Sequence, residues 1–252
     1  MKQLIAFLIA LVPTVAFAAG GSSVPLDHAK VDLEDKASLQ RGAQVFMNYC
    51  MGCHSLEYAR YNRVAKDLGI PEGMMQDNLV FADKKIGSLM SIAMRKEDSK
   101  VWFGATPPDL TLVARVRNPD WLYTYLRSFY QDSTRPYGVN NTVFKDVGMP
   151  NVLGHLQGKV EKGCAPKPEG YDPLTGQEIL VEKCDVLYQV EEGQLSPKEF
   201  DTLVLDLVNF LEYMGEPVAL ERQRIGWFAL LFLLLMLVPV YFLNQEYWKD
   251  VK

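Results

Sequence analysis

The chain has 252 residues and a formal net charge of −5, which is enough length for one well-buried domain. Surfaces that bind nucleic acid need a basic stripe to neutralise phosphates, and this acidic composition argues against such a partner. Only three histidines and four cysteines are present. A metal centre built from several histidines is therefore nearly excluded.

The first 18 residues have the pattern of a secretory signal peptide. Lys2 precedes an apolar stretch that reaches Ala16-Phe17-Ala18, a small-x-small cleavage site. The apolar stretch is shorter than the roughly 20 residues that cross a bilayer as a helix, so an uncleaved anchor is the weaker interpretation. We therefore predict that residues 1–18 are removed and that residues 19–224 form an exported domain.

The most specific motif of the chain is Cys50-Met51-Gly52-Cys53-His54. Apolar residues recur every three or four positions over residues 39–50, which predicts a helix that runs directly into the motif. Two thiols at this spacing can add to the two vinyl groups of one haem, and the histidine that follows then serves as an axial iron ligand. The motif predicts one covalently bound haem c on Cys50, Cys53 and His54.

Two other kinds of site could use the same cysteine pair. A structural zinc site needs four ligands, and most such sites contain a second short cysteine pair, which this chain lacks. A thioredoxin-like redox dithiol belongs in an α/β pattern, which the sequence does not show. The motif and the export signal together favour haem.

A second iron ligand is expected in the middle of the chain. Residues 119–131 predict an aromatic-rich helix, and residues 134–163 contain several turn formers and predict a loop. A Gly-Met-Pro turn in this loop can bring the Met149 thioether to the haem face opposite His54, and methionine ligation raises the reduction potential. We predict Met149 as the sixth ligand, with His155 as the serious alternative.

The late part of the exported domain contains the other two cysteines and most of the excess acid. Cys164 and Cys184 are twenty residues apart, and because exported thiols oxidise readily we predict a structural disulfide between them. Residues 157–224 carry fourteen Asp or Glu against seven Lys or Arg. A solvated surface explains most of this charge, and a docking surface for a basic protein is the alternative.

A strong helix signal begins at Ser196. Ser196 and Glu199 form a capping-box pattern, with Pro197 at the first helical position. Apolar residues then recur at helical spacing until Gly215, which ends the predicted helix. Its apolar face is expected to pack in the core.

Residues 225–243 predict a single membrane-spanning helix. The segment contains nineteen residues without a charge, which nearly matches a hydrocarbon core about 30 Å thick. Aromatic residues lie near both ends, as in interfacial anchoring. Residues 244–252 would then form a cytoplasmic tail. The flanking charges lean mildly against this orientation, so it depends on the signal peptide.

Several motifs are spread along the chain: Arg-Gly-x-x-Val-Phe at 41–46, His-Ser-Leu-Glu-Tyr at 54–58, Pro-Pro-Asp-Leu at 107–110, Val-Gly-Met-Pro at 147–150, and the single C-terminal anchor. Together and in this order they resemble one known family, cytochrome c1. The resemblance covers essentially the whole mature chain. The implied fold is mainly α, a cytochrome c-like haem domain with long loops plus one C-terminal transmembrane helix.

The resemblance also implies roles for residues outside the attachment motif. Pro107 and Pro108 are expected to line the haem pocket on the His54 side, where a backbone carbonyl can fix the histidine tautomer. Arg115 is expected to reach a haem propionate. Trp102 and Phe103 replace an asparagine-rich stretch of mitochondrial members, so pocket polarity differs there.

The implied function is one-electron transfer within a quinol–cytochrome c oxidoreductase, without catalysis by this chain alone. Expected partners are cytochrome b, a Rieske iron–sulfur protein as donor and a soluble or tethered c-type cytochrome as acceptor. The haem domain would face the periplasm from the bacterial inner membrane. A free-standing anchored cytochrome is the main alternative, and a haem enzyme with an open sixth position is another. The short junction before the anchor favours a fixed subunit.

Overall fold

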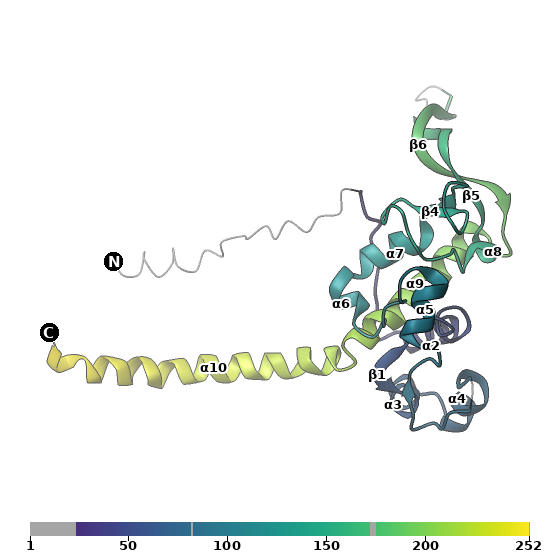
Figure 1. Cartoon of the computed structure of the whole chain (residues 1–252). Helices are drawn as coiled ribbons and strands as arrows, with labels where there is room; N and C mark the ends of the chain where they lie inside the picture. The colour runs from purple at the N-terminus through teal and green to yellow at the C-terminus, as the bar shows by residue number, and fades with distance from the viewer. Residues whose placement is uncertain (1–23, 82, 172–174, 252) are drawn as a thin grey trace.

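A computed structural model describes residues 24–81, 83–171 and 175–251, so the predicted signal peptide lies outside the described residues. Helices dominate, and one long helix leaves a compact domain (Figure 1). In chain order the elements are α2 (Lys36–Val45), the π-helix η1 (Phe46–Cys50), β1 (Leu56–Arg60), α3 (Tyr61–Leu68), α4 (Glu72–Leu79), β2 (Leu89–Met90), α5 (Lys96–Phe103), α6 (Val113–Arg117), α7 (Pro119–Arg127), β3 (Phe129–Gln131), β4 (Val139–Asn141), α8 (Gly154–Gln157), β5 (Gly158–Tyr171), β6 (Glu178–Glu192), α9 (Pro197–Gly215), α10 (Ala219–Tyr247) and the short η2 (Lys249–Val251).

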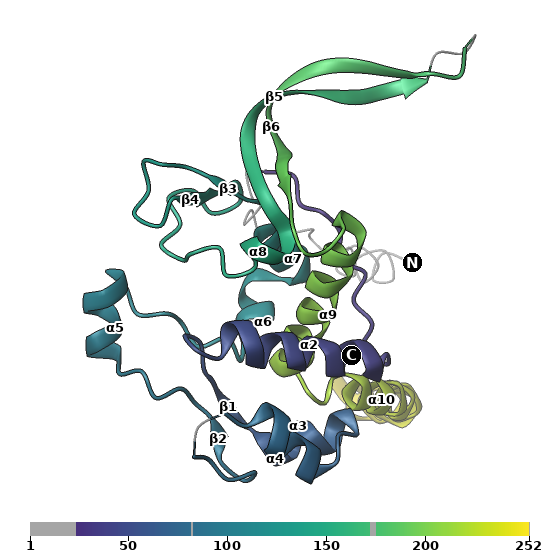
Figure 2. The same ribbon diagram turned by 90° about the vertical axis from the view of Figure 1, so that its right-hand side faces the viewer.

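The core is built where α2 crosses α9 (Figure 2). Both hydrogen bonds of the capping box that starts α9 are present, as its sequence predicts. Beside the crossing, the buried Asp206 carboxylate accepts from the Ser38 hydroxyl at 2.6 Å and from Arg41 Nε at 2.6 Å. Asn209 donates to the Ser38 hydroxyl at 2.7 Å. These bonds hold two helices from opposite ends of the domain against each other. The first of them, α2, leads directly into the cysteine motif.

Gly42 sets how closely the two helices approach, which gives a first prediction. A Cβ at this position would lie 2.0 Å from the Asp206 carbonyl oxygen. We expect Gly42→Ala to lower the free energy of unfolding by about 3 kcal/mol, because backbone on both sides must move. Thermal unfolding followed by circular dichroism measures the loss. Gly73→Ala in α4 is the control, since its Cβ meets nothing within 4 Å; equal stability of the two variants would contradict the prediction.

Three two-stranded antiparallel sheets complete the described part of the domain. The largest, β5–β6, projects from the domain as an arm (Figures 1 and 2). The predicted loop over 134–163 is therefore wrong in part, since it contains β4, α8 and the start of β5. The predicted helix over 119–131 ends at Arg127 and continues as β3. Most residues of the arm are exposed on both faces, so its strands lack the alternating apolar pattern by which strands are recognised.

Cys164 and Cys184 form a disulfide across the arm. Cys164 lies at an irregularity in the strand pairing, between Gly163 and Ala165. We expect serine at both cysteines to loosen the arm by about 3 kcal/mol, the chain-entropy value for a loop of this length. Limited proteolysis should then cut within 158–192 at lower protease concentration than in the unchanged chain. Equal cleavage of the two proteins would contradict a stabilising role.

The anchor helix α10 is longer than the predicted span over 225–243 and contains it. Its 29 residues give a length of roughly 43 Å, which exceeds a hydrocarbon core of about 30 Å. The apolar part has no buried residue in the structure, as expected for a helix that meets lipid. Only three residues separate α9 from α10, so the folded domain lies close to the start of α10.

Candidate haem site

The cysteine motif lies at the end of the helical segment formed by α2 and η1. Met51 N–H donates to the Phe46 carbonyl at 2.9 Å, which closes the π-helical turn. The amides of Cys53 and His54 then both donate to the Cys50 carbonyl, at 3.0 and 2.9 Å. This tight turn brings the two thiols and the imidazole to one end of the helix. π-Helical turns are rare and frequently mark functional sites.

Of the two thiols of the motif, Cys50 lacks the lowered pKa of a reactive redox cysteine. Both are free in the structure, Cys50 buried and Cys53 partly exposed. Burial raises the pKa of Cys50 to about 12, whereas a reactive thiol needs a lowered pKa. No group of three or more His, Cys, Asp or Glu suited to a metal ion occurs among the described residues. The site therefore supplies thiols and one imidazole, the set that a covalent haem requires.

His54 is buried and held in one tautomer. Its Nδ1 donates to the Pro108 carbonyl at 2.7 Å, which leaves Nε2 free to bind iron. Burial lowers the pKa of His54, and the bond to Pro108 opposes this only in part. The ring thus favours the neutral, ligating form. The Pro108 carbonyl thus accepts the ring N–H of His54, and the expectation that Pro107 and Pro108 line a haem pocket stays a prediction.

The segment after Pro108 is fastened alongside the motif. Leu110 N–H donates to the Ser55 carbonyl at 2.9 Å. Glu57 N–H donates to the Asp109 carboxylate at 2.7 Å. These bonds fix the Pro108 carbonyl relative to His54. The imidazole is therefore oriented both by its own backbone segment and by the segment that contains Pro108.

Met149 lies in a loop packed on α7 and is partly buried. The Tyr125 hydroxyl donates to its sulfur at 3.4 Å. Burial raises the pKa of Tyr125, so this hydroxyl keeps its proton. The alternative ligand, His155, is exposed and its ring lies 5.5 Å from that of Tyr49. The assignment of Met149 as the iron ligand stays a prediction.

An arginine and three aromatic residues that sequence reasoning missed are connected to Met149 through Tyr125. Arg117 stacks over Trp121 at 5.0 Å, and Trp121 stacks on Tyr125 with ring centroids 4.8 Å apart. Phe129 meets Tyr125 edge-on at 5.2 Å. We call Trp121, Tyr125 and Phe129 the aromatic row. The four-residue spacing of Trp121 and Tyr125 was the available signal, since such residues share one face of a helix. Phe129 lies beyond the helix, at the start of β3.

Arg115 lies apart from the aromatic row. Its guanidinium donates to the Glu216 carboxylate at 2.9 Å, beside the junction of α9 and α10. The predicted contact with a haem propionate stays a prediction, and the other N–H groups of the exposed Arg115 guanidinium remain available for it. Arg117, two residues on, stacks over Trp121.

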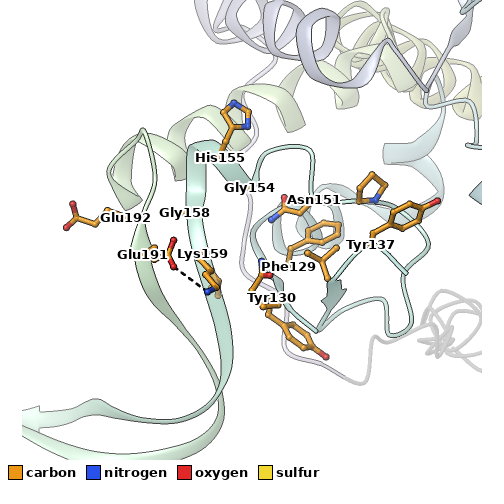
Figure 3. Close-up of a pocket in the computed structure, with 14 residues that line it drawn as sticks. Phe129, Tyr130, Tyr137, Asn151, Gly154, His155, Gly158, Lys159, Glu191 and Glu192 are labelled. Atoms are coloured by element: carbon orange, nitrogen blue, oxygen red, sulfur yellow. Dashed lines mark hydrogen bonds and ion pairs between the residues drawn. The ribbon is translucent and has the colours of Figure 1, made fainter. Parts of the chain in front are cut away.

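A cavity of about 380 Å³ lies between β3, β4 and the base of the arm (Figure 3). His155 and Asn151 border it, and Lys159 pairs with Glu191 at 3.3 Å on its far side. None of Cys50, Cys53, His54 and Met149 lines it. The cavity is thus separate from the attachment motif.

Comparison with known proteins identifies the family. Residues 28–86 and 82–251 match the Cytochrome C1 family. The chain belongs to the cytochrome c1 family. It is 54% identical over 252 residues to cytochrome c1 of Allochromatium vinosum, with 99% of each chain covered. It is 43% identical over 251 residues to a Nitrosomonas europaea protein named ammonia monooxygenase gamma subunit, covering 100% of this chain and 99% of that one. Cytochrome c1 of Rhodospirillum rubrum is 26% identical, with 86% and 83% covered.

Membership of the cytochrome c1 family confirms the predicted cofactor and role. Proteins of this family carry one covalently bound haem c, and the chain is an electron-transfer subunit of the bc complex, not catalytic on its own. The buried His54 with a free Nε2 and the two free thiols of Cys50 and Cys53 fit such a group. With α10 as its anchor, the protein is attached to the membrane.

Proposed function

We propose that this chain takes single electrons from the Rieske iron–sulfur protein of the bc complex and passes them to a soluble or tethered c-type cytochrome. The observation that carries the proposal is the fixed His54 imidazole, buried and bonded to the Pro108 carbonyl beside the two attachment thiols. A bound haem supplies reversible one-electron exchange at its iron. A rigid ligand set keeps the geometry similar in both oxidation states, which suits rapid transfer.

The proposed ligand set is His54 on one side and Met149 on the other. Methionine ligation raises the potential into the range useful for high-potential electron transfer. The Tyr125 hydroxyl bonded to the Met149 sulfur supports this assignment, because it holds the thioether in one orientation. A Met149 that binds iron also closes the sixth position, which argues against a haem enzyme that activates small ligands.

We further propose that the haem domain faces the periplasm and that the C-terminus is cytoplasmic. The export signal predicted for residues 1–18 and the apolar α10 support this orientation. The acidic surplus over 157–224 supports transient docking of a basic acceptor cytochrome, which electrostatic attraction steers.

Purification of the tagged full chain in mild detergent tests the proposal. We expect a b-type cytochrome and an iron–sulfur protein to co-purify, and added quinol to reduce the c haem of the assembly. Adding salt should slow electron transfer to a basic acceptor cytochrome. A chain that emerges alone and is not reduced by quinol would contradict the assignment to a complex and favour a free-standing shuttle.

A further inference from the structure

The loop over 142–148 that leads to Met149 has no helix or strand of its own, and two asparagines at the end of β4 organise it. Asn140 and Asn141 are 4% and 1% exposed, unusually low for this residue type. Buried amides persist only where their donors and acceptors are used. Every polar atom of both side chains has a partner among the residues around the loop.

Asn141 joins the start of the loop to α7. Its Oδ1 accepts from the amides of Val143 at 2.9 Å and Phe144 at 3.1 Å, and from the Ser128 hydroxyl at 3.2 Å. Its Nδ2 donates to the Tyr125 carbonyl at 2.8 Å. The hydroxyl of the same Tyr125 donates to the Met149 sulfur. The Asn141 side chain therefore connects the loop to the residue that contacts Met149.

Asn140 fixes the end of the loop. Its Oδ1 accepts from Asp146 N–H at 2.9 Å, and its Nδ2 donates to Asp132 at 2.9 Å. Asp146 has a left-handed backbone with φ of 61°, a conformation that costs most residues energy and that Asp and Asn adopt more readily than other non-glycine residues. Arg135 Nη2 donates to the Asp146 carbonyl at 2.8 Å. The chain direction is therefore set three residues before Met149.

Val147 completes the support between these bonds and the ligand. It is 3% exposed and packs with Phe129 and Val139 in a small core against which Met149 and Tyr125 lie. The loop is thus held by Asn141 at residues 143 and 144, by Asn140 at Asp146, and by the buried Val147 just before Gly148. The support from the two asparagines therefore reaches to within three residues of Met149.

We propose that Asn140 and Asn141 are positioning residues that hold Met149 at bonding distance from the iron. The proposal rests on Met149 being the sixth ligand. Alanine at either position removes acceptors that the loop amides cannot replace inside the protein. The loop would then sample other conformations, and the methionine–iron bond would be lost for part of the time.

The test uses the full chain with its haem, purified in mild detergent. Asn141→Ala and Asn140→Ala are expected to lose the near-infrared band of methionine-ligated ferric haem, to bind carbon monoxide when reduced, and to show a lowered reduction potential. Asn141→Asp keeps the acceptor Oδ1 and puts a second carboxyl oxygen in place of the Nδ2 that donates to the Tyr125 carbonyl. When that carboxyl is protonated it can still donate, so at low pH the variant should retain more of the band than Asn141→Ala. It also answers the question if Asn141→Ala fails to accumulate.

Two control variants separate positioning from general loss of stability. Ser38→Ala removes a buried hydroxyl between α2 and α9 and should lower the unfolding temperature while keeping the band. Asn78→Ala removes one exposed amide, bonded to the Met74 carbonyl at 2.9 Å, and should change neither property.

The outcomes distinguish the inference from the function on which it rests. A normal band and potential in both asparagine-to-alanine variants, together with loss of the band in Met149→Leu, would overturn the positioning role alone. A normal band in Met149→Leu would overturn the ligand assignment. Loss of the band in Ser38→Ala as well would show that any destabilisation suffices, and would also overturn the positioning role.

Discussion

Replacing both Cys50 and Cys53 with serine is expected to abolish covalent haem attachment. Serine hydroxyls are poor nucleophiles toward the vinyl groups to which thiols add, so no thioether bond can form. Membranes that contain this variant should give no haem stain at the mass of the chain after denaturing electrophoresis, while an antibody to a C-terminal tag still detects it. Quinol-dependent reduction of a c haem should fall to background.

The other cysteine pair supplies the matched control. Serine at Cys164 and Cys184 removes the same number of sulfur atoms from the arm, away from the motif, and should leave haem staining at the level of the unchanged chain. The single Cys53→Ser variant should keep at most one thioether bond. Covalent haem on the chain without Cys50 and Cys53 would contradict the attachment site.

The parts of the site that could be predicted are local in sequence. The attachment motif needs one helical turn, and its five residues contain all the chemistry that they use. The capping box of α9 likewise lies within four residues, and both of its hydrogen bonds are present. The anchor is recognised by length and composition alone, and α10 contains the predicted span.

The parts that could not be predicted depend on contacts between distant residues. Gly42 is a glycine because the Asp206 carbonyl approaches it, and the two positions are far apart in the chain. The buried Asn140 and Asn141 look like ordinary loop polar residues in the sequence, and only the fold shows that they organise the loop before Met149. The arm was not predicted because its two strands pair with each other and not with the core. Their side chains are mostly exposed, so the sequence has no alternation of apolar and polar residues there.

Arg115 stays the predicted partner of a haem propionate, and the nearby Arg117 shows why the sequence alone does not decide between two arginines. A motif can place an arginine near a haem, but the choice between two arginines on a short helix depends on what each one meets. The Arg115 guanidinium donates a hydrogen bond to Glu216, which lies about a hundred residues later in the chain. Arg117 instead stacks on Trp121. A helix of only five residues exposes both side chains, and periodicity does not choose between them.

Met149→Leu is expected to lower the reduction potential by on the order of 0.2 V, a sizeable part of the roughly 0.8 V over which axial ligands set haem potentials. Leucine is close to methionine in volume and apolar, so the loop can still pack against Tyr125 and Val147. It offers no lone pair to the iron, so the stabilisation of the reduced state by the thioether is lost. Redox titration of the purified chain, followed by its visible haem absorbance, measures the shift.

His155→Gln separates the two candidate ligands. If Met149 binds the iron, this variant keeps its potential, because the His155 ring lies against Tyr49 at the border of the cavity and takes no part in ligation. If His155 is the ligand, Met149→Leu leaves the reduction potential unchanged, and His155→Gln opens the sixth position to carbon monoxide. The pattern across the pair, more than the size of either shift, decides which side chain faces His54. A thioether ligand makes the chain a high-potential relay, whereas an imidazole ligand would favour a lower potential, and a lower potential would oppose electron flow from a Rieske centre.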